Sequence, residues 1–119
     1  MIVGSTKENL SLEKRVSLTP ETAKNIIGLG LQVILEKNYA THLGILDQEY
    51  ENSGVKIKNT SNEVISSCNL LVKVNCPSQE DISSLKEKTI IVGMMNPSKN
   101  KNELIEINKK KVDIFSLET

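Results

Sequence analysis

The sequence predicts an α/β fold in which a mainly parallel sheet carries helices on both faces. Short apolar runs rich in β-branched residues alternate with segments of helical spacing, and the connections between them are short. Such connections imply right-handed crossovers between parallel strands. The run TIIVGM at 89–94 is almost entirely apolar, as expected of a strand buried on both faces. Rossmann-like and flavodoxin-like sheets have this organisation.

The first half of the chain supplies three predicted strands, at residues 1–4, 31–36 and 55–58. The third is expected at an edge of the sheet because its alternate positions are lysines. A long polar loop separates the first strand from a helix over 18–30, for which Thr19 is the expected N-cap and Pro20 the first helical residue. Glycines at 28 and 30 would end that helix. A short helix over 47–54, capped by Asp47, is expected next.

The second half of the chain continues the alternation. Its predicted helices cover residues 60–68, 78–88 and 99–111, and its predicted strands cover 69–75, 89–94 and 112–117. Ser78 is the expected cap of the middle helix, with acidic residues in its first turn. There are no repeats or linkers, so residues 1–119 are expected to form one domain. Because the sequence stops directly after a strand, we expect it to be a piece of a longer polypeptide.

Composition argues against several functions. The 15 basic and 15 acidic side chains cancel, and aromatic residues make up only 3%, which argues against nucleic acid as a partner. The N-terminus does not resemble a signal peptide, and no apolar run reaches membrane-spanning length. Cys68 and Cys76 do not form a C-x-x-C pair, so we expect free thiols in a cytosol-like compartment. No cluster of histidines and carboxylates indicates a metal.

The loops at the carboxyl ends of the strands are the expected place for a site. In open parallel sheets, ligands bind outside those ends, at the point where the strand order reverses. Three loops meet this condition, at residues 5–15, 75–78 and 94–98, and all three can converge on one rim. No G-x-G-x-x-G follows a predicted strand, and the GLG at 28–30 ends a helix, so a dinucleotide fingerprint is absent.

Arg15 is the only arginine beside 14 lysines. Its guanidinium could grip a carboxylate or phosphate with two parallel hydrogen bonds. It could equally pair with Glu8 or Glu13 and hold the loop in place. Both roles remain open from the sequence.

Lys73 and Asn75 lie two apart in a predicted strand, so they are expected on one face near its carboxyl end. They could form a polar cluster facing a cleft, although spacing alone slightly favours ordinary alternation with Lys73 reaching water. His42, the only histidine, lies in an irregular stretch and is interpreted as a tolerated polar residue rather than a catalyst.

Taken together, MIVGSTKE, EKRVSLTPETAKNIIGLGLQVILE and LLVKVNCP resemble the N-terminal domain shared by alanine dehydrogenases and NAD(P) transhydrogenase α subunits. The resemblance implies that a separate Rossmann domain follows, carries the glycine-rich loop and binds most of NAD(H). The isolated chain would then be inactive and bind NADH weakly or not at all. It also implies that later helices return to cover this domain, so that part of its apolar surface is left open here.

Two positions of the resemblance favour the transhydrogenase branch. Alanine dehydrogenases carry a second lysine, which contacts the keto acid, where this chain has Asn75. They carry an acid/base histidine near the position of Asn96. Hydride transfer between two nicotinamides needs neither group. The resemblance therefore implies that Arg15, Lys73, Asn75 and Asn96 line a nucleotide cleft, with no catalytic residue and no metal in this chain.

The implied parent enzyme transfers hydride between NADH and NADP+, coupled to proton translocation. Its implied partners are the other domains of the same subunit, membrane and NADP-binding components, and further copies in a homo-oligomer. It would lie on the cytoplasmic or matrix-like side of a membrane complex. Two alternatives are an amino-acid dehydrogenase of alanine or lysine-pathway type, and a non-catalytic assembly or binding module.

Overall fold

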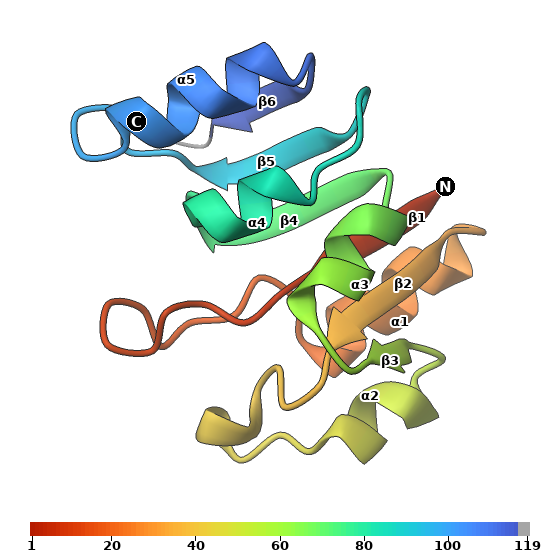
Figure 1. Ribbon diagram of the computed structural model, residues 1–119. Coiled ribbons are helices and arrows are strands. Elements are labelled where there is room, and N and C mark those ends of the chain that lie inside the picture. Colours follow the sequence, from red (N-terminus) through yellow and green to blue (C-terminus); the bar gives the residue numbers. More distant parts are fainter. Residues whose placement is uncertain (117–119) are drawn as a thin grey trace.

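The computed structural model describes residues 1–116 and contains one six-stranded sheet in the order β3-β2-β1-β4-β5-β6. Every pairing is parallel, so the predicted α/β fold is confirmed (Figure 1). The strands are β1 (Ile2–Ser5), β2 (Gln32–Glu36), β3 (Lys56–Lys58), β4 (Leu70–Asn75), β5 (Ile90–Met94) and β6 (Asp113–Ser116). The helices are α1 (Pro20–Gly28), η1 (Thr41–Leu43, a 3-10 turn), α2 (Asp47–Asn52), α3 (Ser61–Ser67), α4 (Gln79–Ser83) and α5 (Lys101–Lys109). Residue 117 of the last predicted strand lies outside the described residues.

The signals at the ends of α1 are confirmed. The Thr19 side chain accepts a hydrogen bond from the Thr22 N–H at 3.1 Å, and Pro20 occupies the first helical position. Gly30 follows the helix with φ of +94°, a conformation that other residues rarely adopt. The lysine-bearing strand β3 lies at the edge of the sheet, also as predicted.

Two helix predictions were wrong in detail. Leu46, not Asp47, is the residue before α2, and the Asp47 carboxylate instead accepts from the Asn38 N–H at 3.0 Å. Helix α4 ends at Ser83 instead of continuing to residue 88. It stops there because Leu85 turns into the core and the Lys110 ammonium donates to the carbonyls of Ser83 and Leu85.

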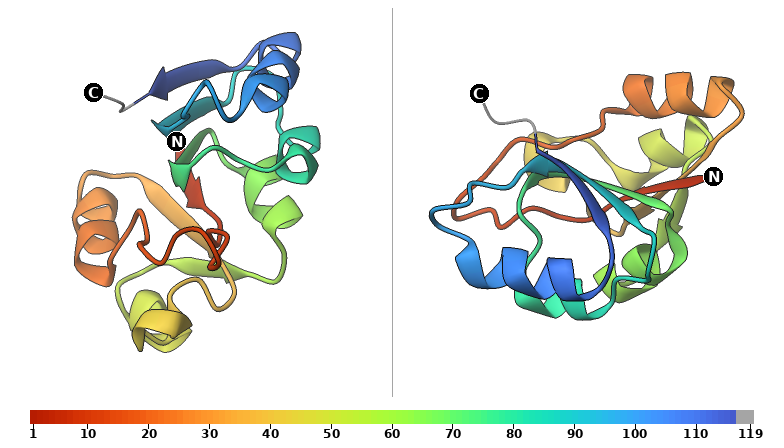
Figure 2. Two further views of the ribbon diagram at one scale, coloured as in Figure 1. Left: turned by 90° about the vertical axis from the view of Figure 1, so that its left-hand side faces the viewer. Right: turned by 90° about the horizontal axis from the view of Figure 1, so that it is seen from above.

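The helices form a layer on each side of the sheet, shown in Figure 2. Helices α3, α4 and α5 cover one face and enclose a core cluster centred on Leu71, Ile91 and Ile107. Helices α1 and α2 cover β1, β2 and β3 on the other face, over a second cluster that includes Tyr39 and Tyr50. The helical layer on this second face therefore covers half of the sheet.

The other half of that face is apolar and open among the described residues. Val72 packs at the margin of the second cluster, and the parallel register places Val92 and then Phe115 beside it. Val72 and Val92 are only partly buried, whereas Met94 and Phe115 are 38% and 59% exposed. The prediction that β5 is buried on both faces was therefore wrong for this face, where no described helix lies over it.

The strand order reverses between β1 and β4. These two strands pair only at Val3 with Leu70 and at Gly4 with Leu71, so they part toward their carboxyl ends. The resulting crevice is the switch point at which ligands bind in sheets of this order. Among residues 1–116, no helix has the length and apolar character needed to cross a membrane.

Candidate functional site

A cavity of about 640 Å³ opens at the carboxyl edge of the sheet, within the size range of small-molecule pockets. The three loops predicted to converge all contribute to it. Its lining residues are Lys7, Glu8, Asn9, Leu12, Glu13, Lys73, Asn75, Cys76, Pro77, Ser78, Asp81, Asn96, Lys99, Asn100 and Glu103. We call residues 6–19 the first loop and residues 95–100 the second loop.

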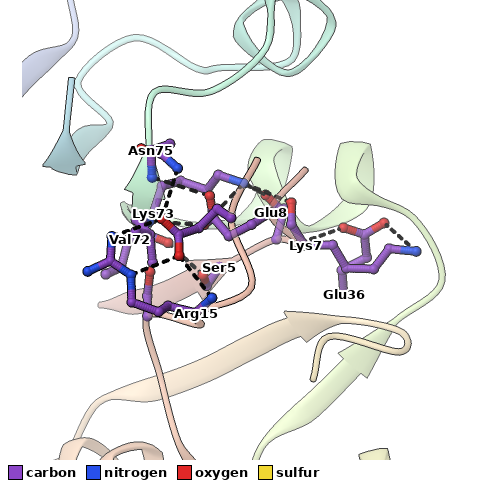
Figure 3. A network of polar contacts seen from close by, with 12 residues as sticks. Ser5, Lys7, Glu8, Arg15, Glu36, Val72, Lys73 and Asn75 are labelled. Atoms are coloured by element: carbon purple, nitrogen blue, oxygen red, sulfur yellow. Dashed lines mark hydrogen bonds and ion pairs between the residues drawn. The ribbon is translucent and has the colours of Figure 1, made fainter. Parts of the chain in front are cut away.

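Glu8 turns from the first loop into the switch-point crevice and is buried there. Its carboxylate accepts hydrogen bonds from the backbone N–H of Val74 at 2.9 Å and of Asn75 at 3.2 Å (Figure 3). The Lys73 ammonium lies 3.5 Å from the same carboxylate. A glutamate in a polar loop, which the sequence suggests is solvated, thus binds the end of β4.

Lys73 is 5% exposed, so the interpretation that it reaches water was wrong. Its ammonium donates to the Thr6 hydroxyl at 3.1 Å and to the Lys7 carbonyl at 2.8 Å, and it faces Glu8. These three partners satisfy the three donors of the ammonium, which makes the burial of this charge tolerable. Lys73 therefore holds the first loop to the end of β4.

The end of β4 is free to bind Glu8 because its pairing with β5 is irregular there. The register slips between Val72 and Asn75, as in a β-bulge. Gly93 of β5 lies so close to the Lys73 carbonyl that an added Cβ would collide with it. The N–H groups of Val74 and Asn75 consequently point to the first loop.

Arg15 pairs with Glu13, which was one of the two roles left open by the sequence. The guanidinium Nε and Nη2 donate to the two carboxylate oxygens at 2.8 and 2.9 Å. Asn75 Nδ2 donates to the same carboxylate at 3.3 Å. Hydrogen bonds from Arg15 lower the pKa of Glu13 to about 2 and raise that of Arg15. Glu13 therefore links two of the predicted site residues.

Asn96 lies on the opposite side of the cavity, at the start of the second loop. Its φ of +47° is in the left-handed region, which asparagine tolerates better than most residues. Its carbonyl accepts from the N–H groups of Lys99 and Asn100, which shapes the turn into α5. The Asn100 amide donates to the Met95 carbonyl at 2.8 Å, and Met95 is buried in the core.

Tyr39 fixes the end of the first loop through a fully used hydroxyl. Ser5 Oγ donates to the Val72 carbonyl, so the Tyr39 hydroxyl must donate to Ser5 Oγ, at 2.9 Å. The same hydroxyl accepts from the N–H groups of Ser17 at 3.0 Å and Leu18 at 3.2 Å. Burial raises the pKa of Tyr39, which keeps this proton in place.

Tyr50 and His42 add two further attachments to the first loop. The Tyr50 hydroxyl donates to the Leu18 carbonyl at 2.7 Å, and its ring meets that of Tyr39 edge to face at 5.7 Å. His42 Nε2 lies 2.7 Å from the Lys14 carbonyl, so this nitrogen carries the proton. His42, which lies in the unpredicted η1, is thus a structural contact of the loop that bears Arg15.

The structure brings Lys73, Asn75 and Asn96 to one cavity, whereas Arg15 lies outside its lining and reaches it through Glu13. Contact of these four residues with a ligand stays a prediction. Sequence reasoning missed Glu8 and both tyrosines. The tyrosines carried a signal, because they are the only two in a chain with few aromatic residues.

The lining is rich in paired charges and contains no histidine. Its acidic side chains are Glu8, Glu13, Asp81 and Glu103, and its basic ones are Lys7, Lys73 and Lys99. Burial raises the pKa of the Cys76 thiol to about 11, so it is not a ready nucleophile. Within residues 1–116, no group of three or more histidines, cysteines and carboxylates could hold a metal ion. The arrangement is suited to holding and orienting a ligand.

Two curated relatives match nearly the whole chain. The first of the separately encoded α-subunit chains of an NAD(P) transhydrogenase from Rickettsia prowazekii is 32% identical over 122 residues, covering 99% of this chain and 32% of its own length. Alanine dehydrogenase 1 of Staphylococcus aureus is 30% identical over 119 residues, covering 100% of this chain and 32% of its own length. The chain thus spans about a third of the length of these relatives.

A solved structure shares the fold. The transhydrogenase of Sinorhizobium meliloti superposes with a TM-score of 0.89 at 27% identity, covering 98% of this chain and 34% of that protein. Residues 4–119 match the family described as alanine dehydrogenase/PNT, N-terminal domain. The chain therefore belongs to the alanine dehydrogenase/PNT N-terminal domain family.

Proposed function

We propose that this chain is the N-terminal part of an NAD(P) transhydrogenase α subunit and forms one side of its NAD(H) cleft. The observation that carries the proposal is the environment of Asn75. This neutral side chain reaches the cavity and donates to Glu13, at the position where the family's alanine dehydrogenases use a second lysine. The long match to the Rickettsia prowazekii subunit supports the same assignment.

The residues of the cavity fit one end of NAD(H) better than the whole molecule. The volume of about 640 Å³ suits a ring and its carboxamide, for which the side-chain amides of Asn75 and Asn96 are suitable partners. The backbone donors at the end of β4 are already used by Glu8, which leaves them unavailable to a pyrophosphate. When bound, NAD(H) would supply the hydride, while Arg15, Lys73, Asn75 and Asn96 would position and enclose it.

The remaining parts of the enzyme would be supplied by other segments. We assign the glycine-rich NAD-binding loop to a Rossmann domain that follows residue 119, and proton translocation to membrane components. The open apolar surface over β4, β5 and β6, which includes Val92 and Phe115, would be covered by later segments of the same subunit. An isolated chain would then be inactive and would bind NADH weakly.

The proposal is tested on the natural full-length polypeptide that contains this chain, assembled with its partner subunits. We expect reduction of an NADP+ analogue by NADH, and no NADH oxidation with pyruvate and ammonium. Turnover with pyruvate and ammonium would contradict the proposal. The sequence after residue 119 gives an independent check, because an R-x-x-R-A-Q-like segment is expected soon after it.

An alanine dehydrogenase-like enzyme is the second candidate. It is favoured by the retention of Arg15 and by the 30% identity to the Staphylococcus aureus enzyme over the whole chain. On this alternative the same assay gives pyruvate-dependent turnover. The open sheet surface instead favours a third candidate, a non-catalytic assembly module, for which NADH binding to the full-length protein would be absent.

A further inference from the structure

The switch-point crevice contains a set of donors suited to an anion. In doubly wound folds a helix N-terminus after β1 faces this crevice and binds phosphate. Here β1 leads into the first loop, and the donors come from the end of β4 instead. They are the N–H groups of Val74 and Asn75 and the ammonium of Lys73. Two backbone N–H groups and a cation are a common arrangement for holding a carboxylate or phosphate.

Glu8 satisfies all three donors from within the chain. Its carboxylate lies 2.9 Å from the Val74 nitrogen, 3.2 Å from the Asn75 nitrogen and 3.5 Å from the Lys73 ammonium. The Glu8 side chain is only 2% exposed. No second anion can reach these donors while Glu8 is in place.

We propose that Glu8 is a built-in anion at the anion-binding position of the fold, so that the cavity beside it accepts an uncharged or cationic group and rejects anions. The charges of the lining agree, because four carboxylates face three lysines. The nearby Arg15 guanidinium is likewise paired, through Nε and Nη2, with Glu13. Applied to the proposed function, on which this last step rests, the phosphates of NAD(H) would bind away from this crevice.

The test follows the backbone amide signals of Val74 and Asn75 in the 15N-labelled 119-residue chain at neutral pH, with acetate and inorganic phosphate as probes. In the wild type we expect no saturable shift of these two signals with either anion. Glu8→Ala should show a saturable acetate-induced shift at both amides, with an affinity at least about tenfold above that of the wild type. Glu103→Ala is the matched control, because it removes a carboxylate from the same cavity without emptying the donors, and it should gain no acetate site.

If Glu8→Ala does not fold in buffer, acetate should restore its folded spectrum, whereas chloride at equal ionic strength should not. Glu8→Gln should fold and show no acetate shift, because its amide still fills the crevice. Saturable binding of either anion by the wild type at Val74 and Asn75 would overturn the proposal. Failure of acetate to bind or restore Glu8→Ala would overturn it equally. No nucleotide is used, so this outcome is independent of the hydride-transfer assay.

Discussion

The two loops that border the cavity are held in different ways. The first loop, residues 6–19, is bound to residues distant in the sequence through Glu8, Tyr39 and Tyr50. In the second loop, residues 95–100, the bonds of Asn100 run to neighbours at most five positions away. A buried long-range network specifies one geometry, whereas a local turn opens without unfolding the domain. The cavity thus has one fixed side and one that opens at lower cost.

The largest effect should come from breaking the buried pair of the first loop. Lys73→Ala leaves the Glu8 carboxylate buried without its cation, so we expect a loss of about 3 kcal/mol in the free energy of unfolding. Urea denaturation followed by circular dichroism measures it. Lys99→Ala, at an exposed position of the second loop, is the control and should change stability by less than about 0.5 kcal/mol. Equal effects at the two positions would refute the contrast.

Tyr39→Phe should have the next largest effect. Loss of the hydroxyl leaves the N–H groups of Ser17 and Leu18 without a partner and removes the donor to Ser5, at a cost of about 2 kcal/mol. Tyr50→Phe, which removes one bond to the Leu18 carbonyl, should cost about 1 kcal/mol. The same denaturation experiment ranks them, and a costlier Tyr50→Phe would show that the role of Tyr39 is overstated.

The second loop should respond less to a comparable change. Asn100→Ala removes the side-chain bond to the Met95 carbonyl and should cost about 1 kcal/mol or less. Its amide signal changes should stay within residues 95–101, because its bonds are local. Shifts that spread to Ser17 or Val74 would mean that the two loops are coupled.

The smallest effect concerns the acid titration of Glu13. Its pKa of about 2 lies below the ordinary 4.5, so the pair with Arg15 is intact above pH 4.5 and is lost as the pH falls toward 2. Arg15→Gln should return the pKa of Glu13 toward its ordinary value, measured from the carboxyl 13C shift. Asn75→Ala should raise the pKa of Glu13 by much less. An unchanged pKa in Arg15→Gln would show that the pair does not form.

Much of the fold was predictable because it rests on local signals. The cap at Thr19, the glycine at 30 and the lysines of β3 each act within a few residues, and all three predictions are confirmed. The convergence of the three loops also follows from strand direction alone. The length of α4 was not predictable, since a distant lysine, Lys110, helps to end it.

The interior of the site was predicted less well. Glu8 bonds to groups 66 and 67 positions away, and its partners are backbone N–H groups exposed by a register slip that leaves no trace in composition. The burial of Lys73 depends on the same encounter. Arg15, Asn75 and Asn96 were identified through their place in motifs, and their contact with a ligand stays a prediction.

Native-state hydrogen exchange tests the contrast between the two loops most directly. The amides of Val74, Asn75, Ser17 and Leu18 should exchange only when the whole domain unfolds, and denaturant should accelerate all four alike. The Asn100 amide should exchange at least about a hundredfold faster, through local opening. Exchange of the first-loop amides at the rate of Asn100 would contradict the account of a cavity with one fixed side.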